Sequence, residues 1–246
     1  MSFRYLLVLT TAFAALAQTG EIVLRIPPAT ISLDAGGQPV AVTVWGSLSR
    51  ESADVFRLKL TADLGNFQQS ITPLLRSQLN RSERCGERIS VEQAELAAAA
   101  PSSVLTATVH YERWGCVKAF GKEVNKRMVG GNGVLKVKLT PAVDASGVAL
   151  RSEVIGIEAD GSLGELLRSG STGDALKEKI AASVRSAIEK SANFNNVLPP
   201  EIGSAVTIRS VEFATGPEGH LSIEALADAH ISPDRLKALD KVLASR

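Results

Sequence analysis

Hydrophobic and polar residues alternate along much of the chain, and a repeat of two residues is typical of strands with one buried face. In residues 55–64, Phe56 and Leu58 fall on one face of the predicted strand, whereas Arg57 and Lys59 fall on the other. The same alternation, or short apolar runs between turn residues, predicts further strands over residues 21–26, 29–33, 40–45, 89–96, 104–114, 134–143, 148–158, 206–213 and 221–229. Short turn signals between several of these runs favour antiparallel pairing.

Two other segments, residues 66–79 and 174–191, repeat their apolar residues at helical spacing. In the first, Pro73 predicts that the regular helix begins there, with Thr72 as its cap. The apolar faces include Leu75 and Leu79 in the first segment and Ile180, Val184 and Ile188 in the second. The predicted fold is α+β, a long antiparallel sheet wrapped around two amphipathic helices.

The order of predicted elements repeats once. Residues 55–114 and residues 148–231 both follow the order strand, helix, strand, strand. The segment Ile89–Leu96 also resembles Val206–Phe213 position by position. Alternating strands often look alike by chance, so the two explanations are a duplicated unit and a coincidence of pattern. In either case residues 18–246 are expected to form a single domain.

The N-terminus has the features of a secretory signal peptide. Arg4 supplies a positive charge, Leu6–Ala15 is mostly apolar, and Ala15-Leu16-Ala17 offers small residues for cleavage before Gln18. The apolar stretch is shorter than the roughly 20 residues that a membrane-spanning helix needs. We therefore expect residues 1–17 to be removed and the mature protein to be secreted or periplasmic.

Cys85 and Cys116 are the only cysteines, and an exported protein meets oxidising conditions. Their spacing matches neither a zinc site nor a thioredoxin-like motif. We expect a structural disulfide, which by closing a loop of about 32 residues would stabilise the fold by about 3–4 kcal/mol in the chain-entropy model.

Charge is balanced, with 27 Lys and Arg against 26 Asp and Glu. Such a balance argues against a dedicated nucleic-acid binder, which normally shows a basic excess. Residues 117–133 are predicted to form a loop, and they contain a group of cations, Lys118, Lys122, Lys126 and Arg127. These side chains could contact anionic lipid headgroups. The alternative is a solvated loop.

Catalytic and metal-binding motifs are missing from the sequence. It contains no nucleophile elbow, no HExxH and no calcium-binding loop. His110, Glu112 and Trp114 share one face of a predicted strand, where successive residues of that face are about 7 Å apart. An acid–base pair of a hydrolase is one interpretation of them, and a solvated polar face is the favoured one. We expect no enzyme activity, no cofactor and no metal.

A further indication comes from the C-terminal half. The predicted helix over residues 174–191, the segment Val197–Pro200 and the hairpin containing Ile208–Phe213 and His220–Glu224 resemble the tubular lipid-binding superfamily, to which the bactericidal/permeability-increasing protein belongs. The resemblance covers roughly residues 40–232. It implies a long antiparallel sheet curled around a helix, with an apolar tunnel for acyl chains.

These observations favour an exported, non-enzymatic binding protein for a lipid or another apolar ligand, with a membrane surface as a further candidate partner. The residues expected to line its ligand site are Leu75, Leu79, Ile180, Val184 and Ile188. The alternative is a protein–protein interaction module of the cell envelope, which would hold its partner through a sheet edge or through residues 117–133.

Overall fold

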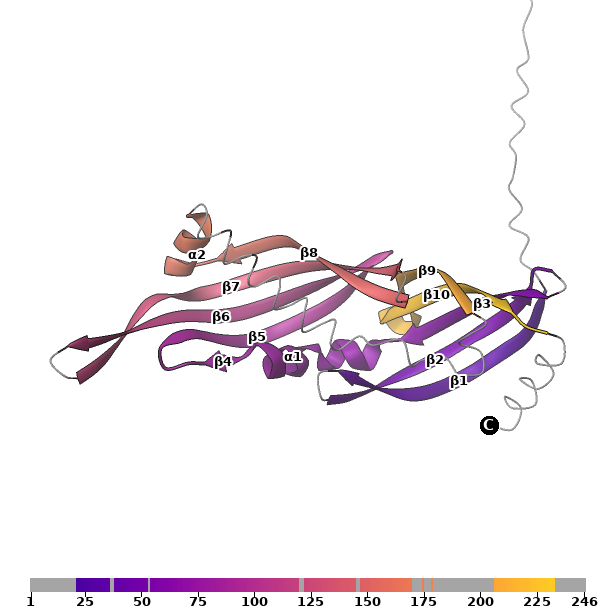
Figure 1. The fold of residues 1–246 in the computed structure, drawn as a ribbon, viewed down its shortest axis with the longest axis horizontal. Coiled ribbons are helices and arrows are strands. Elements are labelled where there is room, and N and C mark those ends of the chain that lie inside the picture. The colour runs from indigo at the N-terminus through magenta and orange to yellow at the C-terminus, as the bar shows by residue number, and fades with distance from the viewer. Residues whose placement is uncertain are drawn as a thin grey trace, which may run out of the picture.

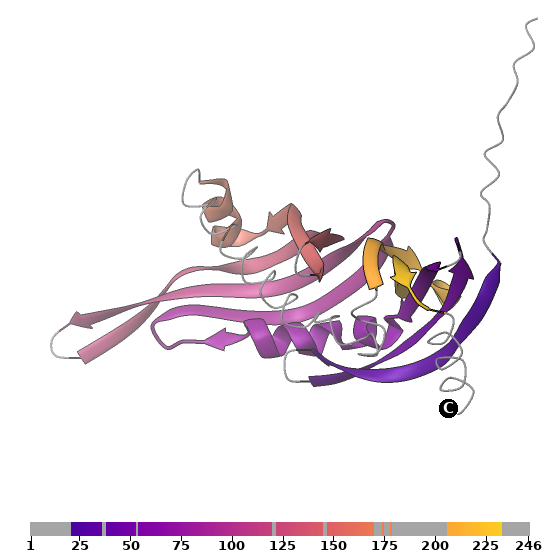
Figure 2. The ribbon, with the colours of Figure 1, turned by 45° about the vertical axis from the view of Figure 1, so that its right-hand side comes forward.

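Antiparallel strands dominate the structure, a computed structural model of this protein (Figure 1). It describes residues 21–35, 38–52, 54–119, 122–144, 147–169 and 206–232, together with Asp174 and Glu178. The described strands form two five-stranded sheets that follow one another along the long axis of the molecule (Figures 1 and 2). No described helix has the length and hydropathy that crossing a membrane would need.

Sheet A has the strand order β1-β2-β3-β10-β9 and combines the two ends of the chain. Its strands are β1 (Ile22–Ala35), β2 (Gln38–Arg50), β3 (Val55–Asp63), β10 (Leu221–His230) and β9 (Val206–Thr215). A 3-10 turn, Pro217–Gly219, joins β9 to β10. The two strands predicted over residues 21–26 and 29–33 are one strand, which has an irregular register at the Pro27-Pro28 step because proline donates no ladder hydrogen bond.

Sheet B has the order β4-β5-β6-β7-β8. Its strands are β4 (Arg81–Ser82), β5 (Gly86–Ala99), β6 (Ser102–Ala119), β7 (Lys122–Asp144) and β8 (Gly147–Ala159). The described helices are α1 (Gly65–Leu79) and α2 (Gly161–Arg168). The predicted antiparallel, sheet-dominated architecture is therefore confirmed.

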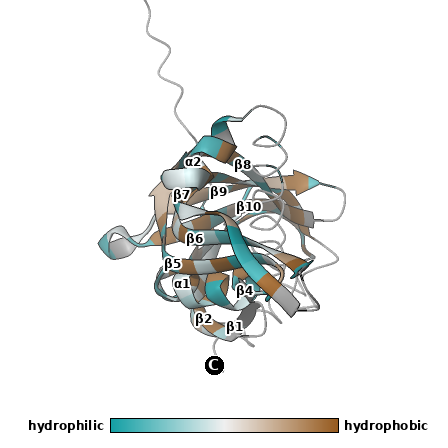
Figure 3. Cartoon of the chain, turned by 90° about the vertical axis from the view of Figure 1, so that its left-hand side faces the viewer, coloured by the Kyte–Doolittle hydropathy of each residue, from teal (hydrophilic) through white to brown (hydrophobic). Residues whose placement is uncertain are grey.

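The predicted alternation decides which side chains are buried, and Figure 3 shows hydrophobic and hydrophilic positions mixed along each strand. On β3, Phe56 and Leu58 are 1% exposed, and on β6 Leu105 is fully buried. The main core lies where α1 packs between the two sheets. It includes Val42 and Ala62 of sheet A, Ile71, Leu75 and Leu79 of α1, and Leu96, Leu105 and Val137 of sheet B.

Helix α1 begins earlier than predicted. It runs through Pro73 from Gly65, so the expected start at Pro73 with a Thr72 cap is wrong. The Thr72 hydroxyl instead lies 2.9 Å from both the carbonyl oxygen and the amide nitrogen of Ala94. Because these contacts and the burial of Ile71 and Leu75 tie α1 to β5, tertiary packing offsets the cost of an internal proline.

The predicted loop over residues 117–133 is also wrong. The β6–β7 pairing continues through this region, from Ser103 opposite Leu139 to Ala119 opposite Lys122. Glycines and cations are weak strand formers, and here the pairing with β6 supplies the strand conformation. The result is a long hairpin whose end projects from the rest of sheet B (Figures 1 and 2).

The glycines of this region let α2 approach β7 closely. A Cβ atom on Gly131 would lie 2.5 Å from the carbonyl oxygen of Asp160 and 3.0 Å from the Cβ of Leu163, which is buried on α2. Leu163 also packs against Tyr111. Residues Gly130 to Gly133 therefore form a surface on which α2 packs, and they are not a flexible connection.

We expect Gly131→Ala to destabilise the protein by about 1–3 kcal/mol, because α2 has to move to admit the methyl group. Gly156→Ala is the matched control, since its nearest neighbour would lie at 3.7 Å, an ordinary contact. Urea unfolding of both variants measures the difference. Equal stability of the two variants would contradict this account of the packing.

The two predicted repeats contain β3, α1, β5 and β6 in the first case and β8, α2, β9 and β10 in the second. In each, the helix follows a strand of one sheet and precedes a strand pair of the other. Duplication itself stays a prediction. The predicted signal peptide, the segment Val197–Pro200 and, apart from Asp174 and Glu178, the helix predicted over residues 174–191 lie outside the described residues.

Candidate functional site

An apolar groove lies on one face of sheet A. Residues of β2, β3, β9 and β10 line it, together with Val148 of β8. Its lining consists of Val42, Val44, Leu58, Leu60, Thr61, Ala62, Val148, Val206, Ile208, Val211, Ile223, Ala225 and Ala227. The groove offers about 80 Å³ to the centres of water molecules, several times the roughly 10–15 Å³ that one water occupies on this measure.

The lining is aliphatic apart from Thr61, and it continues into the core. Val42 and Ala62 belong both to the groove and to the main core. Val44 and Ala225, by contrast, are only half-buried among the described residues. Covering such a surface is favourable by about 25 cal/mol for each Å² of apolar area removed from water. The groove can therefore hold a hydrocarbon chain, and its lining provides few polar partners for a polar ligand.

The structure separates the residues that were predicted to line a ligand site. Leu75 and Leu79 are 2% and 8% exposed in the core around α1, and neither is among the groove-lining residues. The other three, Ile180, Val184 and Ile188, lie outside the described residues. Ligand contact by these five residues stays a prediction.

The groove residues of β9 and β10 were missed at the level of sequence. Val206 and Ile208 showed only the alternation that every strand of this chain shows. Their place in the groove follows from the pairing of β10 with β3, which joins the C-terminal hairpin to the N-terminal strands. No motif in the sequence indicates that pairing.

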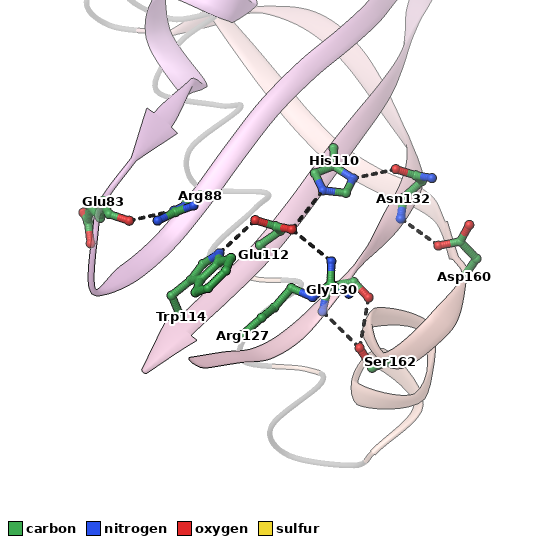
Figure 4. A network of polar contacts seen from close by, with 10 residues as sticks. All are labelled: Glu83, Arg88, His110, Glu112, Trp114, Arg127, Gly130, Asn132, Asp160 and Ser162. Carbon is green, nitrogen blue, oxygen red and sulfur yellow. Dashed lines mark hydrogen bonds and ion pairs between the residues drawn. The ribbon is translucent and has the colours of Figure 1, made fainter. Parts of the chain in front are cut away.

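A polar network occupies the outer part of sheet B, around Glu112 of β6 (Figure 4). The indole nitrogen of Trp114 donates a 2.8 Å hydrogen bond to Oε2 of Glu112, and Arg127 donates a 3.1 Å bond to Oε1. His110 places Nε2 3.5 Å from Oε1 of the same carboxylate, and its Nδ1 lies 2.7 Å from the side-chain oxygen of Asn132. All of these side chains come from β6 and its partner β7.

Neighbouring elements extend the network. The guanidinium of Arg88 lies over the Trp114 ring at 4.4 Å from its centroid, and its Nε donates to the carbonyl oxygen of Glu83. On the other side, Ser162 of α2 contacts the backbone of Gly130, as Figure 4 shows. The network thus fastens the strands of the hairpin to one another and to α2.

His110 and Glu112 influence each other's protonation. Hydrogen bonds from Trp114 and then Arg127 lower the pKa of Glu112, so that this carboxyl is ionised over a wider pH range. The hydrogen bond with Asn132, and then the neighbouring Glu112, raise the pKa of His110 against the opposing effect of burial. Both oxygens of the Glu112 carboxylate thus have partners from the hairpin itself, Trp114 at Oε2 and Arg127 and His110 at Oε1.

We expect the contribution of His110 to stability to be pH dependent. Its pKa is raised on folding, so the contribution is complete below the ordinary value of 6.5 and disappears as the pH rises through the folded-state value. The contribution of Glu112 to stability depends on pH in the opposite direction. Because the pKa of Glu112 is lowered on folding, this contribution is complete above pH 4.5 and is lost on acidification. The melting temperature of His110→Gln should therefore fall furthest below that of the wild type at about pH 5.5 and approach it at about pH 8. A difference independent of pH would contradict the pairing.

The predicted disulfide is confirmed. Cys85 and Cys116 are bonded, with their Cα atoms 5.5 Å apart, and the bond ties the turn before β5 to the outer part of β6. The predicted headgroup-contacting cations belong to the same part of the hairpin. Lys118, Lys126 and Arg127 have exposed side chains, and Lys122 is the first residue of β7.

Comparison with known proteins leaves the family open. No protein family model and no curated protein matches the chain. Among solved structures, a crystal structure of lipopolysaccharide binding protein is similar to it, with 11% identity and a TM-score of 0.37. The likeness covers 73% of this chain and 32% of that one, so this chain spans about a third of its neighbour's length.

Proposed function

We propose that this protein is a non-enzymatic carrier or receptor for an apolar ligand, and that the groove of sheet A holds the ligand's hydrocarbon chain. The observation that carries the proposal is the groove's lining, which is aliphatic apart from Thr61 and includes the half-buried Val44 and Ala225. Monomeric proteins seldom leave a concave surface of this composition without a use. The predicted signal peptide and the disulfide support an exported protein, secreted or periplasmic.

A long, unbranched chain fits this groove better than a polar or compact ligand does. The lining residues come from four neighbouring strands, so the apolar surface extends across the sheet and not into a single deep hole. Small side chains such as Ala225 and Ala227 leave room beside larger ones such as Ile208. We therefore propose an acyl chain of a lipid as the ligand, with the lipid headgroup left outside the groove.

Native mass spectrometry of the secreted protein, followed by organic extraction, tests the proposal. We expect an added mass that extracts as lipid. Ala225→Phe should weaken retention about 15- to 50-fold, because the ring takes the place of two or three methylene groups worth about 0.8 kcal/mol each. Ala97→Phe, at an exposed alanine of β5, is the matched control and should retain the lipid.

Two results would contradict the proposal. A bare polypeptide mass, unchanged after incubation with a lipid mixture, would favour the envelope interaction module instead. Lipid retained equally by Ala225→Phe and by the wild type would place the ligand outside the groove. Circular dichroism of both variants establishes that any loss of ligand is not a loss of fold.

A further inference from the structure

The projecting end of the β6–β7 hairpin exposes large apolar side chains to solvent. Val117 is 62% exposed, Val124 is 53% exposed and Met128 is 64% exposed, the three highest values among the large apolar residues of the described chain. All three lie beyond Glu112 and Gly130, which are paired across the hairpin. This part of the molecule, residues 112–119 and 122–130, is here called the hairpin end, and it lies at the left of Figure 1.

The three apolar residues share one face of the hairpin. Val117 and Val124 are direct partners across the two strands, and direct partners project to the same side. Met128 belongs to this side as well, because its sulfur would lie 3.3 Å from a Cβ atom on Gly115, which precedes Val117 by two residues. An apolar strip therefore runs along one side of the hairpin end, and no described element covers it.

The sequence of the hairpin end is rich in cations. The hairpin end contains five Lys or Arg, Arg113, Lys118, Lys122, Lys126 and Arg127, against two acids, Glu112 and Glu123. Its formal charge of +3 contrasts with +1 for the whole chain, so the remainder of the chain carries −2. Positive charge is thus concentrated in the same segment as the most exposed large apolar side chains of the described residues.

The hairpin end is braced from its other side. The disulfide joins Cys116 to Cys85, and Trp114 is held between Arg88 and the carboxylate of Glu112. These contacts fasten the hairpin to β5, so that the strip is presented by a supported element. A strip of this kind, in a fold that could have covered it, indicates a partner.

We propose that the hairpin end docks onto the surface of an anionic lipid bilayer, with Val117, Val124 and Met128 entering the interfacial region and the neighbouring Lys118 and Lys126 contacting the headgroups. Aliphatic side chains beside lysines and arginines match the two layers that such a surface offers, hydrocarbon below and negative charge above. A protein partner would need a patterned acidic and apolar surface, whereas an anionic bilayer supplies both properties without a specific arrangement. The proposal does not depend on the groove of sheet A.

Co-sedimentation with vesicles tests the docking. The protein is produced from the full-length gene in a secreting host, and its intact mass records whether the predicted leader has been removed. We expect binding to vesicles of phosphatidylglycerol and phosphatidylcholine, and little binding to phosphatidylcholine alone. Binding should weaken as salt is raised, because salt screens the cations.

Two double variants test the apolar and the electrostatic contributions to docking separately. Val117→Ser/Val124→Ser should weaken binding at least about tenfold by removing the inserted apolar area. Lys118→Gln/Lys126→Gln should weaken it by about 30-fold, at roughly fivefold for each charge removed. Val143→Ser/Ile155→Ser, at exposed apolar positions elsewhere, and Lys136→Gln/Lys138→Gln, at exposed cations elsewhere on β7, are the matched controls and should bind as the wild type does.

Binding that is equal for the two kinds of vesicle, or equal for the hairpin-end variants and their controls, would overturn the proposal. Absence of vesicle binding by the folded wild type would also overturn it and would leave a protein partner for the strip. Ala225→Phe separates this proposal from the proposed function, because it should reduce retained lipid without changing vesicle binding.

Discussion

Replacing Leu105 with alanine is expected to lower the free energy of unfolding by about 3–4 kcal/mol. Leu105 is fully buried in the centre of sheet B, where it lies between Leu96 on β5 and Val137 on β7. The substitution removes three carbon atoms from a filled core. Its cost combines the lost transfer of those atoms from water with the cavity that strands held by ladder hydrogen bonds cannot close.

Leu226→Ala is the matched control, since Leu226 also lies on a strand but is 37% exposed. We expect it to change stability by less than about 0.5–1 kcal/mol. Urea unfolding of both variants, followed by circular dichroism, measures the difference. Similar losses in the two variants would show that the two sheets do not pack around Leu105 as described.

Replacing both cysteines with serine is expected to cost about 3–4 kcal/mol, because the bond between Cys85 and Cys116 closes a loop of about 32 residues in the unfolded chain. The loss should come mainly from the greater entropy of the unfolded state. The same two side chains brace the hairpin end, so local protection should decrease there first.

Thermal unfolding of Cys85→Ser/Cys116→Ser and of the reduced wild type measures this effect, and the two samples should agree. Hydrogen exchange should show the earliest loss of protection in the outer parts of β5 and β6. Unchanged stability after the double replacement would mean that the unfolded chain gains no freedom from the loss of the bond. That result would contradict the chain-entropy account for this protein.

Much of the fold could be predicted, because an element that buries one face has apolar residues at regular spacing in the sequence. On β3 and β6, every second residue had to be apolar to reach the core, and Phe56, Leu58 and Leu105 are buried as the alternation indicated. The apolar face of α1 was likewise visible through Leu75 and Leu79. The disulfide needed no periodicity, since a chain with two cysteines has one way to pair them.

Other elements could not be predicted, because their conformation depends on neighbours that are distant in sequence. Pro73 lies inside α1, where the contacts of Thr72 with β5 and the burial of Ile71 compensate for it. The run from Gly130 to Gly133 looks like a flexible connection until β6 pairs with it and α2 packs on it. The local preference of a residue for strand or helix has a smaller effect on its conformation than such tertiary contacts have.

The sequence by itself determined the strand-rich class, the inward faces of the central strands and the identity of the disulfide, because these follow from local periodicity and composition. Only the tertiary structure determined where the two proposed sites, the groove and the hairpin end, are formed. The groove joins Val44 near one end of the chain to Ile208 near the other through the β3–β10 pairing, and the hairpin end gathers apolar and basic side chains through the register of β6 and β7. Many alternating segments of this chain could pair with one another. The free energy that favours the observed pairing comes from packing of the whole core and not from any single segment.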